Sequence, residues 1–110
     1  MANTPEGKVK KSILQWLSYQ KNCEVFPIAT TGVWDAKRNL YRTTVGRKGT
    51  PDILVCWHGN FIAIEVKGPR GKLTESQALV LQSIRENGKG IAVVANCVED
   101  VVKAFAQALQ

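Results

Sequence analysis

Two β-rich runs joined by a tight turn constrain the fold of this chain more than any other feature of its sequence. Residues 53–57 and 61–67 are rich in β-branched and aromatic side chains, and His58-Gly59-Asn60 between them has the composition of a hairpin turn. The two runs are therefore predicted to pair as antiparallel strands. Gly68-Pro69-Arg70-Gly71 then ends the second strand, because glycine and proline continue a strand poorly.

A helix and a further strand are predicted after this hairpin. Thr74-Glu75-Ser76-Gln77 has the form of a capping box, an apolar stripe follows over residues 80–84, and Gly88 is a natural helix stop. Residues 91–95 form the continuous apolar run typical of a buried strand. Because strand–helix–strand crossovers are right-handed, residues 61–67 and 91–95 are predicted to lie parallel in one sheet.

Helices are also predicted at both ends of the chain. Thr4 is a good N-cap and Pro5 suits the first position of a helix over about residues 5–21. Asn96 and Glu99 are candidate caps of a last helix. The predicted inner faces consist of Val9, Ile13, Trp16 and Leu17 in the first helix, and of Val98, Val102, Phe105 and Leu109 in the last.

The remaining segments complete an α/β architecture. Residues 24–30 are predicted as a strand, in which Pro27 indicates either an edge position or a bulge. Residues 31–50 are polar, basic and rich in glycine, which predicts mainly a mobile loop with room for a short strand around residues 40–45. The element order predicts one domain over residues 1–110, a sandwich with a mixed β-sheet flanked by helices.

Length and composition exclude several classes of protein. The 110 residues fit one domain, no apolar run is long enough to span a bilayer, and no signal-like segment follows the basic N-terminal residues. These features predict a cytoplasmic protein. The three cysteines, Cys23, Cys56 and Cys97, lack CxxC spacing, so they are interpreted as small apolar core residues and not as a zinc site or disulfide framework.

The charge distribution points to a polyanionic partner. The formal net charge is +6, and between Lys37 and Lys72 eight basic residues surround only two acids, Asp52 and Glu65. A basic field suits nucleic acid, although a solubilising surface would have the same composition. The candidate phosphate contacts, each equally compatible with a solvated charge, are Arg42, Arg47, Lys48, Arg70 and Lys72.

Strand periodicity brings the two acids together with a lysine. Side chains alternate along a strand, so Glu65 and Lys67 share a face at the strand end. A turn centred on Gly59-Asn60 places Asp52 opposite Lys67 and diagonal to Glu65, whereas a turn at His58-Gly59 places Asp52 directly opposite Glu65. Both turns put the three side chains on one face, while a three-residue loop would reverse the parity.

Such a group has two interpretations. Two neighbouring carboxylates can hold Mg²⁺, which lowers the pKa of a bound water, and Lys67 would then orient the attacking hydroxide or stabilise the transition state. The alternative is a cross-strand ion pair of Asp52 and Lys67, with Glu65 exposed to solvent.

Three stretches of the sequence resemble the VRR-NUC domain, a branch of the PD-(D/E)xK nuclease superfamily. They are Gly49-Thr50-Pro51-Asp52, Phe61-Ile62-Ala63-Ile64-Glu65-Val66-Lys67 and Leu73-Thr74-Glu75-Ser76-Gln77, and the resemblance extends over nearly the whole chain. The family occurs as stand-alone phage and bacterial proteins and within larger DNA-repair nucleases, so the location implied is a bacterial or phage-infected cell. The resemblance implies a restriction-endonuclease-like fold and a Mg²⁺- or Mn²⁺-dependent endonuclease that hydrolyses DNA, preferring branched or four-way-junction DNA.

The resemblance also implies roles for individual residues. Asp52 and Glu65 match the metal-binding acids of the family, the backbone carbonyl of Val66 would be a further ligand, and Lys67 matches the catalytic lysine.

Two residues outside the strands also match the family. Gln77 matches a helix glutamine that faces the active site, and the same residue fits the capping box with Thr74. Glu6 resembles an acid on the first helix that completes the metal site in related nucleases.

Stand-alone members resemble archaeal Holliday-junction resolvases, which implies a homodimer because a symmetric junction needs two cuts. Trp34, Leu40 and Tyr41 either contribute to such an interface or pack on the core. Two other functions remain open, a DNA-structure-binding module that does not cleave and an RNA-directed nuclease.

Overall fold

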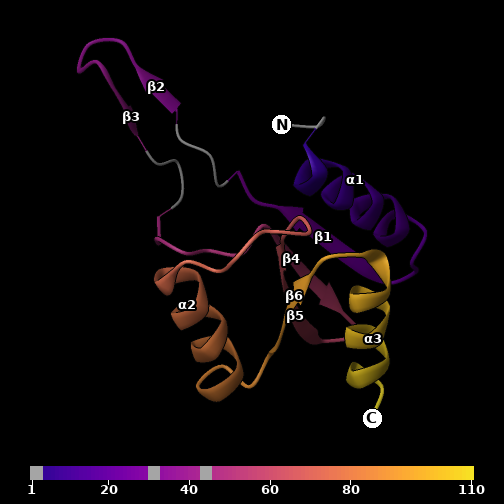
Figure 1. The fold of residues 1–110 in the computed structure, drawn as a ribbon. Helices are drawn as coiled ribbons and strands as arrows, with labels where there is room; N and C mark the ends of the chain where they lie inside the picture. The colour runs from indigo at the N-terminus through magenta and orange to yellow at the C-terminus, as the bar shows by residue number, and fades with distance from the viewer. Residues whose placement is uncertain (1–3, 30–32, 43–45) are drawn as a thin grey trace.

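The computed structural model describes residues 4–29, 33–42 and 46–110 (Figure 1). Within them lie three helices and two sheets. In chain order the elements are α1 (Pro5–Ser18), β1 (Cys23–Pro27), β2 (Val33–Asp35), β3 (Leu40–Arg42), β4 (Ile53–Trp57), β5 (Asn60–Val66), α2 (Glu75–Glu86), β6 (Ile91–Ala95) and α3 (Val98–Ala108).

The main sheet is mixed, with the strand order β1-β4-β5-β6. The first two pairings are antiparallel and β5 pairs parallel with β6, which confirms the predicted crossover through α2. β1 is an edge strand. Pro27 at its end has no backbone N–H to donate, and an edge strand tolerates this because one of its sides has no neighbouring strand.

Helices cover both faces of this sheet, and the fold class predicted from the sequence is confirmed. α1 and α3 pack against each other and against one face, whereas α2 packs on the opposite face over β5 and β6 (Figure 1). The core between α1, α3 and the sheet contains Ile13, Leu17, Ile53, Ile62 and Phe105, all buried. The architecture is compatible with a restriction-endonuclease-like fold.

The β4–β5 turn adopts the second of the two registers considered from the sequence. His58 and Gly59 both have positive φ, 50° and 79°, and Trp57 pairs with Asn60. Two central residues with positive φ match the twist of the flanking strands. Because Ile53 pairs with Ile64, the preceding Asp52 lies opposite the following Glu65.

The first helix begins as predicted and ends earlier. The Thr4 side chain caps it by accepting a hydrogen bond from the Gly7 N–H at 2.9 Å. The helix ends at Ser18 and not near Lys21, because the chain turns through Asn22, whose φ of 56° is left-handed, before it enters β1.

The inner face predicted for the last helix was right at Val98 and Phe105 and wrong at Val102 and Leu109. Val101 is buried in α3, whereas Val102 and Leu109 are exposed. The small Ala104 faces the core next to Phe105, so the buried stripe runs through Val101 and these two residues.

The predicted caps of α3 are also corrected. Cys97 is the N-cap and makes no side-chain capping bond, and Glu99 is exposed. The Asn96 backbone N–H donates instead to the carboxylate of Asp100 at 2.9 Å.

The cysteines are free, and two of them are not core residues. Cys56 and Cys97 are exposed, and Cys23 is half-buried. Cys56 is exposed because its position in β4 faces the side of the sheet that α2 covers only at β5 and β6.

The segment predicted mainly as a loop contains a two-stranded hairpin. β2 and β3 pair antiparallel, with Trp34 opposite Tyr41 in the register. Trp34 and Leu40 are exposed and so do not pack on the core. The predicted strand positions 30 and 43–45, and the side chain of Tyr41, lie outside the described residues.

None of the helices in the described ranges is long and apolar enough to cross a membrane.

Matched leucines on two helices test this packing. Leu17 in α1 is 1% exposed and Leu79 in α2 is 57% exposed. We expect Leu17→Ala to lower the free energy of unfolding by about 2–5 kcal/mol, because it leaves a cavity. Leu79→Ala should change it by no more than about 0.5 kcal/mol. Urea unfolding measures both values, and similar decreases in the two variants would contradict this packing.

Candidate active site

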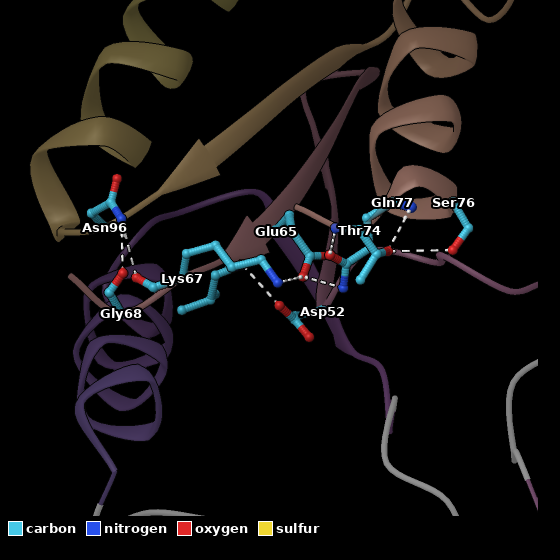
Figure 2. Close-up of polar contacts among 9 residues, drawn as sticks. Asp52, Glu65, Lys67, Gly68, Thr74, Ser76, Gln77 and Asn96 are labelled. Atoms are coloured by element: carbon cyan, nitrogen blue, oxygen red, sulfur yellow. Dashed lines mark hydrogen bonds and ion pairs between the residues drawn. The ribbon is translucent and has the colours of Figure 1, made fainter. Parts of the chain in front are cut away.

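Asp52 is fixed at the start of β4 through both its side chain and its backbone. Its side chain is mostly buried, and Oδ2 accepts a hydrogen bond from the backbone N–H of Val66 at 2.8 Å (Figure 2). Its carbonyl accepts a second hydrogen bond from Ile28 N–H at 2.7 Å. The carboxylate is therefore held against the end of β5, where Glu65 lies.

Glu65 occupies the centre of the site. This acidic residue is only 2% exposed. Its Oε2 lies 3.6 Å from Lys67 Nζ and accepts a hydrogen bond from Gln77 Nε2 at 3.2 Å (Figure 2). The alternative in which Glu65 is exposed to solvent is therefore wrong.

Lys67 is buried directly after β5. Its backbone N–H donates to Ala95 O at 2.9 Å, which extends the β5–β6 ladder by one residue. This extension keeps the strand alternation as far as Lys67, so its side chain lies on the same face as Glu65. The sequence-based grouping of Asp52, Glu65 and Lys67 agrees with this geometry.

The pKa of Glu65 is raised from its ordinary value of 4.5 to about 8. Burial is the largest cause, followed by the charge of Asp52 and a hydrogen bond with that carboxyl group, and Lys67 opposes the shift. Two adjacent buried carboxyl groups cannot both ionise cheaply. The site thus holds a proton or needs additional positive charge near neutral pH.

Gln77 fills both roles suggested by the sequence. Its Oε1 accepts the backbone N–H of Thr74 at 2.9 Å, and the Thr74 hydroxyl accepts the Gln77 N–H at 3.2 Å, which completes the capping box. The other end of the same amide donates to Glu65. The helix cap therefore fixes the direction from which the amide approaches the acid.

Asn96 is a supporting residue that was interpreted from the sequence only as a helix cap. Its side-chain amide donates to Lys67 O at 3.4 Å and to Gly68 O at 3.3 Å (Figure 2). These bonds hold the chain where it leaves β5. The signal was its position directly after β6, because the carboxyl ends of parallel strands meet at one sheet edge.

Gly49 fixes the approach to Asp52. Its φ is 88°, and a Cβ at this position would lie 2.4 Å from the backbone oxygen of Ser76. The segment before Asp52 therefore passes against the first turn of α2, and only glycine fits there.

The other charged candidate residues that the structure describes are exposed. Glu6 is exposed in the first turn of α1, and with Arg70 it lines a cleft of about 470 Å³ between that turn and the loop after β5. Among the described residues, no three His, Cys, Asp or Glu side chains cluster as metal ligands. Four of the basic candidates are exposed, namely Arg47, Lys48, Arg70 and Lys72. The side chain of Arg42 lies outside the described part of the chain.

A helix-flanked mixed sheet with Pro51-Asp52 and Glu65-Val66-Lys67 at the ends of adjacent strands defines a protein of the PD-(D/E)xK nuclease class. The sequence model of the VRR-NUC domain family matches residues 4–98, so this chain belongs to the VRR-NUC family of nucleases. Searches of curated proteins and of solved structures found no significant match.

The raised pKa of Glu65 predicts how stability depends on pH in the absence of divalent cations. Between about pH 4.5 and 8 the folded protein keeps a proton that the unfolded chain releases, so the free energy of unfolding should fall as the pH rises. Glu65→Gln, which resembles the protonated acid, should flatten this dependence. Glu24→Gln, at an exposed acid, should retain it.

Urea unfolding midpoints across this pH range in EDTA provide the measurement. A dependence that is equally steep in Glu65→Gln and in the unmodified protein would show that another group is responsible.

Proposed function

We propose that this chain is a metal-dependent endonuclease that hydrolyses the phosphodiester bonds of DNA and selects branched or four-way-junction DNA. The observation that carries the proposal is the burial of Asp52 and Glu65 on one face, with the Lys67 ammonium 3.6 Å from Glu65. A structural ion pair needs one acid and one base, whereas this group holds a second buried acid at a free-energy cost.

The donor set fits a hard divalent cation. Asp52 and Glu65 supply carboxylate oxygens, and the carbonyl of Val66 between Glu65 and Lys67 is the further ligand that we assign. Mg²⁺ keeps several waters and needs few protein ligands, so the lack of a third clustered acid among the described residues is no obstacle. Mn²⁺ is expected to substitute. Such a cation supplies an activated water and charge stabilisation at the phosphorus.

The other residues of the site position the acids and stabilise negative charge on the substrate. The Lys67 ammonium lies beside the acids and can stabilise negative charge that develops on the phosphate oxygens. Gln77 holds the Glu65 carboxylate from the α2 side, and Asn96 holds the backbone after Lys67. The capping box and the β5–β6 ladder fix these groups before substrate binds, which reduces the reorganisation needed during the reaction.

Charge and surface support the partners that we propose. The net charge of +6 favours binding to a polyanion, and the exposed basic residues near the site can contact phosphates. A symmetric junction favours a two-fold homodimer. Exposed Phe26 in β1 and exposed Phe61 near the start of β5 offer an apolar surface for a second copy of the chain.

Cleavage of a labelled substrate panel tests the proposal. The panel contains duplex, single-stranded, flap and four-way-junction DNA together with matching RNA, each in Mg²⁺, Mn²⁺ or EDTA. We expect metal-dependent cutting with a preference for the junction. Asp52→Asn, Glu65→Gln and Lys67→Met should each lower the rate by about 100-fold or more. The controls Glu24→Gln and Lys103→Met remove the same charges at exposed positions and should keep the rate.

Three results would contradict the proposal. Full activity in Glu65→Gln would remove the assigned site. Junction binding without cleavage in any metal would indicate a binding module. Faster cleavage of RNA than of DNA would indicate an RNA-directed nuclease.

A further inference from the structure

The β2–β3 hairpin stands apart from the rest of the fold. Within the described ranges its two strands pair only with each other and contact no other helix or strand. Figure 1 shows the hairpin projecting well beyond the main sheet. An isolated two-stranded hairpin is only marginally stable in water, so this hairpin adds little to the stability of the fold.

The tip of the hairpin has a defined structure that presents two cations. The Asp35 carboxylate accepts the backbone N–H groups of Lys37 and Arg38 at 3.0 and 3.2 Å and lies 4.0 Å from Arg38 Nε. Asn39 then takes a left-handed φ of 55°. The one acid of the hairpin is thus used to shape the turn, and Lys37 and Arg38 remain exposed.

The strands beside this tip expose large apolar surface. Trp34 is 49% exposed and Leu40 is 46% exposed. A basic tip with apolar flanks suits a nucleic-acid groove, because Lys and Arg bind phosphate oxygens and the acceptor atoms of guanine, and apolar groups contact the methyl group of thymine.

The described segments that precede and follow the hairpin in the chain both contact the active-site region. On the entering side the Ile28 N–H donates to the carbonyl of Asp52. On the returning side Gly49 packs against Ser76, one residue before Gln77. Arg47 and Lys48 lie on this returning segment and add two exposed cations. A duplex bound by the hairpin would therefore lie next to the acids.

We propose that the β2–β3 hairpin enters the major groove of a DNA duplex next to the scissile phosphate, and this inference rests on the proposed function. A B-form major groove about 12 Å wide admits a two-stranded ribbon. The three strand residues Val33–Asp35 span about 10 Å and the turn lies beyond them, so the hairpin is longer than the groove depth of about 8.5 Å. The deep and narrow major groove of A-form RNA does not admit such a ribbon, so the hairpin would select DNA duplexes over RNA duplexes.

Neutralising the tip tests this inference. Lys37→Gln/Arg38→Gln is compared with Lys21→Gln/Lys103→Gln, which removes the same charge at exposed positions elsewhere. Affinity for a short labelled DNA duplex and for the matching RNA duplex is measured in EDTA over a range of salt. Hydrolysis of bis(p-nitrophenyl) phosphate with Mn²⁺ measures the activity of the catalytic site on a small substrate that has no groove.

The tip variant should bind the DNA duplex about tenfold more weakly and lower the slope of log affinity against log salt by about 2, one for each phosphate that the variant no longer neutralises. The control variant should bind DNA with the affinity and salt slope of the unmodified protein. The tip variant should hydrolyse the small diester at the rate of the unmodified protein. DNA carrying bulky C5 substituents, which fill the major groove, should bind the unmodified protein as weakly as unmodified DNA binds the tip variant.

Distinct results would overturn the inference. An unchanged affinity and salt slope in the tip variant would remove the hairpin from the interface, and equal weakening on DNA and RNA would exclude groove insertion. If Trp34→Ala/Leu40→Ala converted a dimer to a monomer in light scattering without DNA, the hairpin would be a surface between chains. Absence of small-diester hydrolysis in the unmodified protein would refute the proposed function, a result separable from the binding comparison.

Discussion

The carboxyl groups of Asp52 and Glu65 lie side by side and are largely removed from water. Their burial costs free energy, which the surrounding structure offsets. The Val66 N–H holds one oxygen of Asp52, the Gln77 amide holds Glu65, and the Lys67 ammonium lies beside them. These partners come from β5, from the residue directly after it and from α2, and β5 and α2 also form the sheet and its cover. The folded core and the reactive group are thus built by the same elements.

Much of this site follows from strand alternation and turn chemistry. The period of two placed Glu65 and Lys67 together, and the hairpin turn brought Asp52 to them. The sequence left two registers open because His58-Gly59 and Gly59-Asn60 both have turn composition. His58 adopts a left-handed φ, which is uncommon without glycine, so local preference alone did not identify this turn.

The features that were missed depend on tertiary contacts. Asn96 acts across the β5–β6 edge, on residues far away in the sequence. On α3 the core contacts run through Val101 and Ala104, and not through the predicted Val102 and Leu109. Cys56 is exposed because α2 does not extend over β4. The sequence pattern within β4 does not indicate how far a neighbouring helix extends. The isolated hairpin was hidden within a polar segment that lacks a core-facing stripe.

The shared use of Gln77 narrows the chemistry that this position tolerates. Its planar amide accepts a bond from Thr74 at one end and donates a bond to Glu65 at the other. A half-turn of the amide would exchange acceptor and donor and break both bonds. Glutamate would keep the acceptor for the helix cap but would turn a carboxylate oxygen toward Glu65. Glutamate equals glutamine as a capping-box residue, yet here it would also be a third acid beside a buried pair. The preference for glutamine over the near-isosteric glutamate at this position thus comes from the acidic residues of the neighbouring sheet. Helix capping alone does not distinguish the two residues.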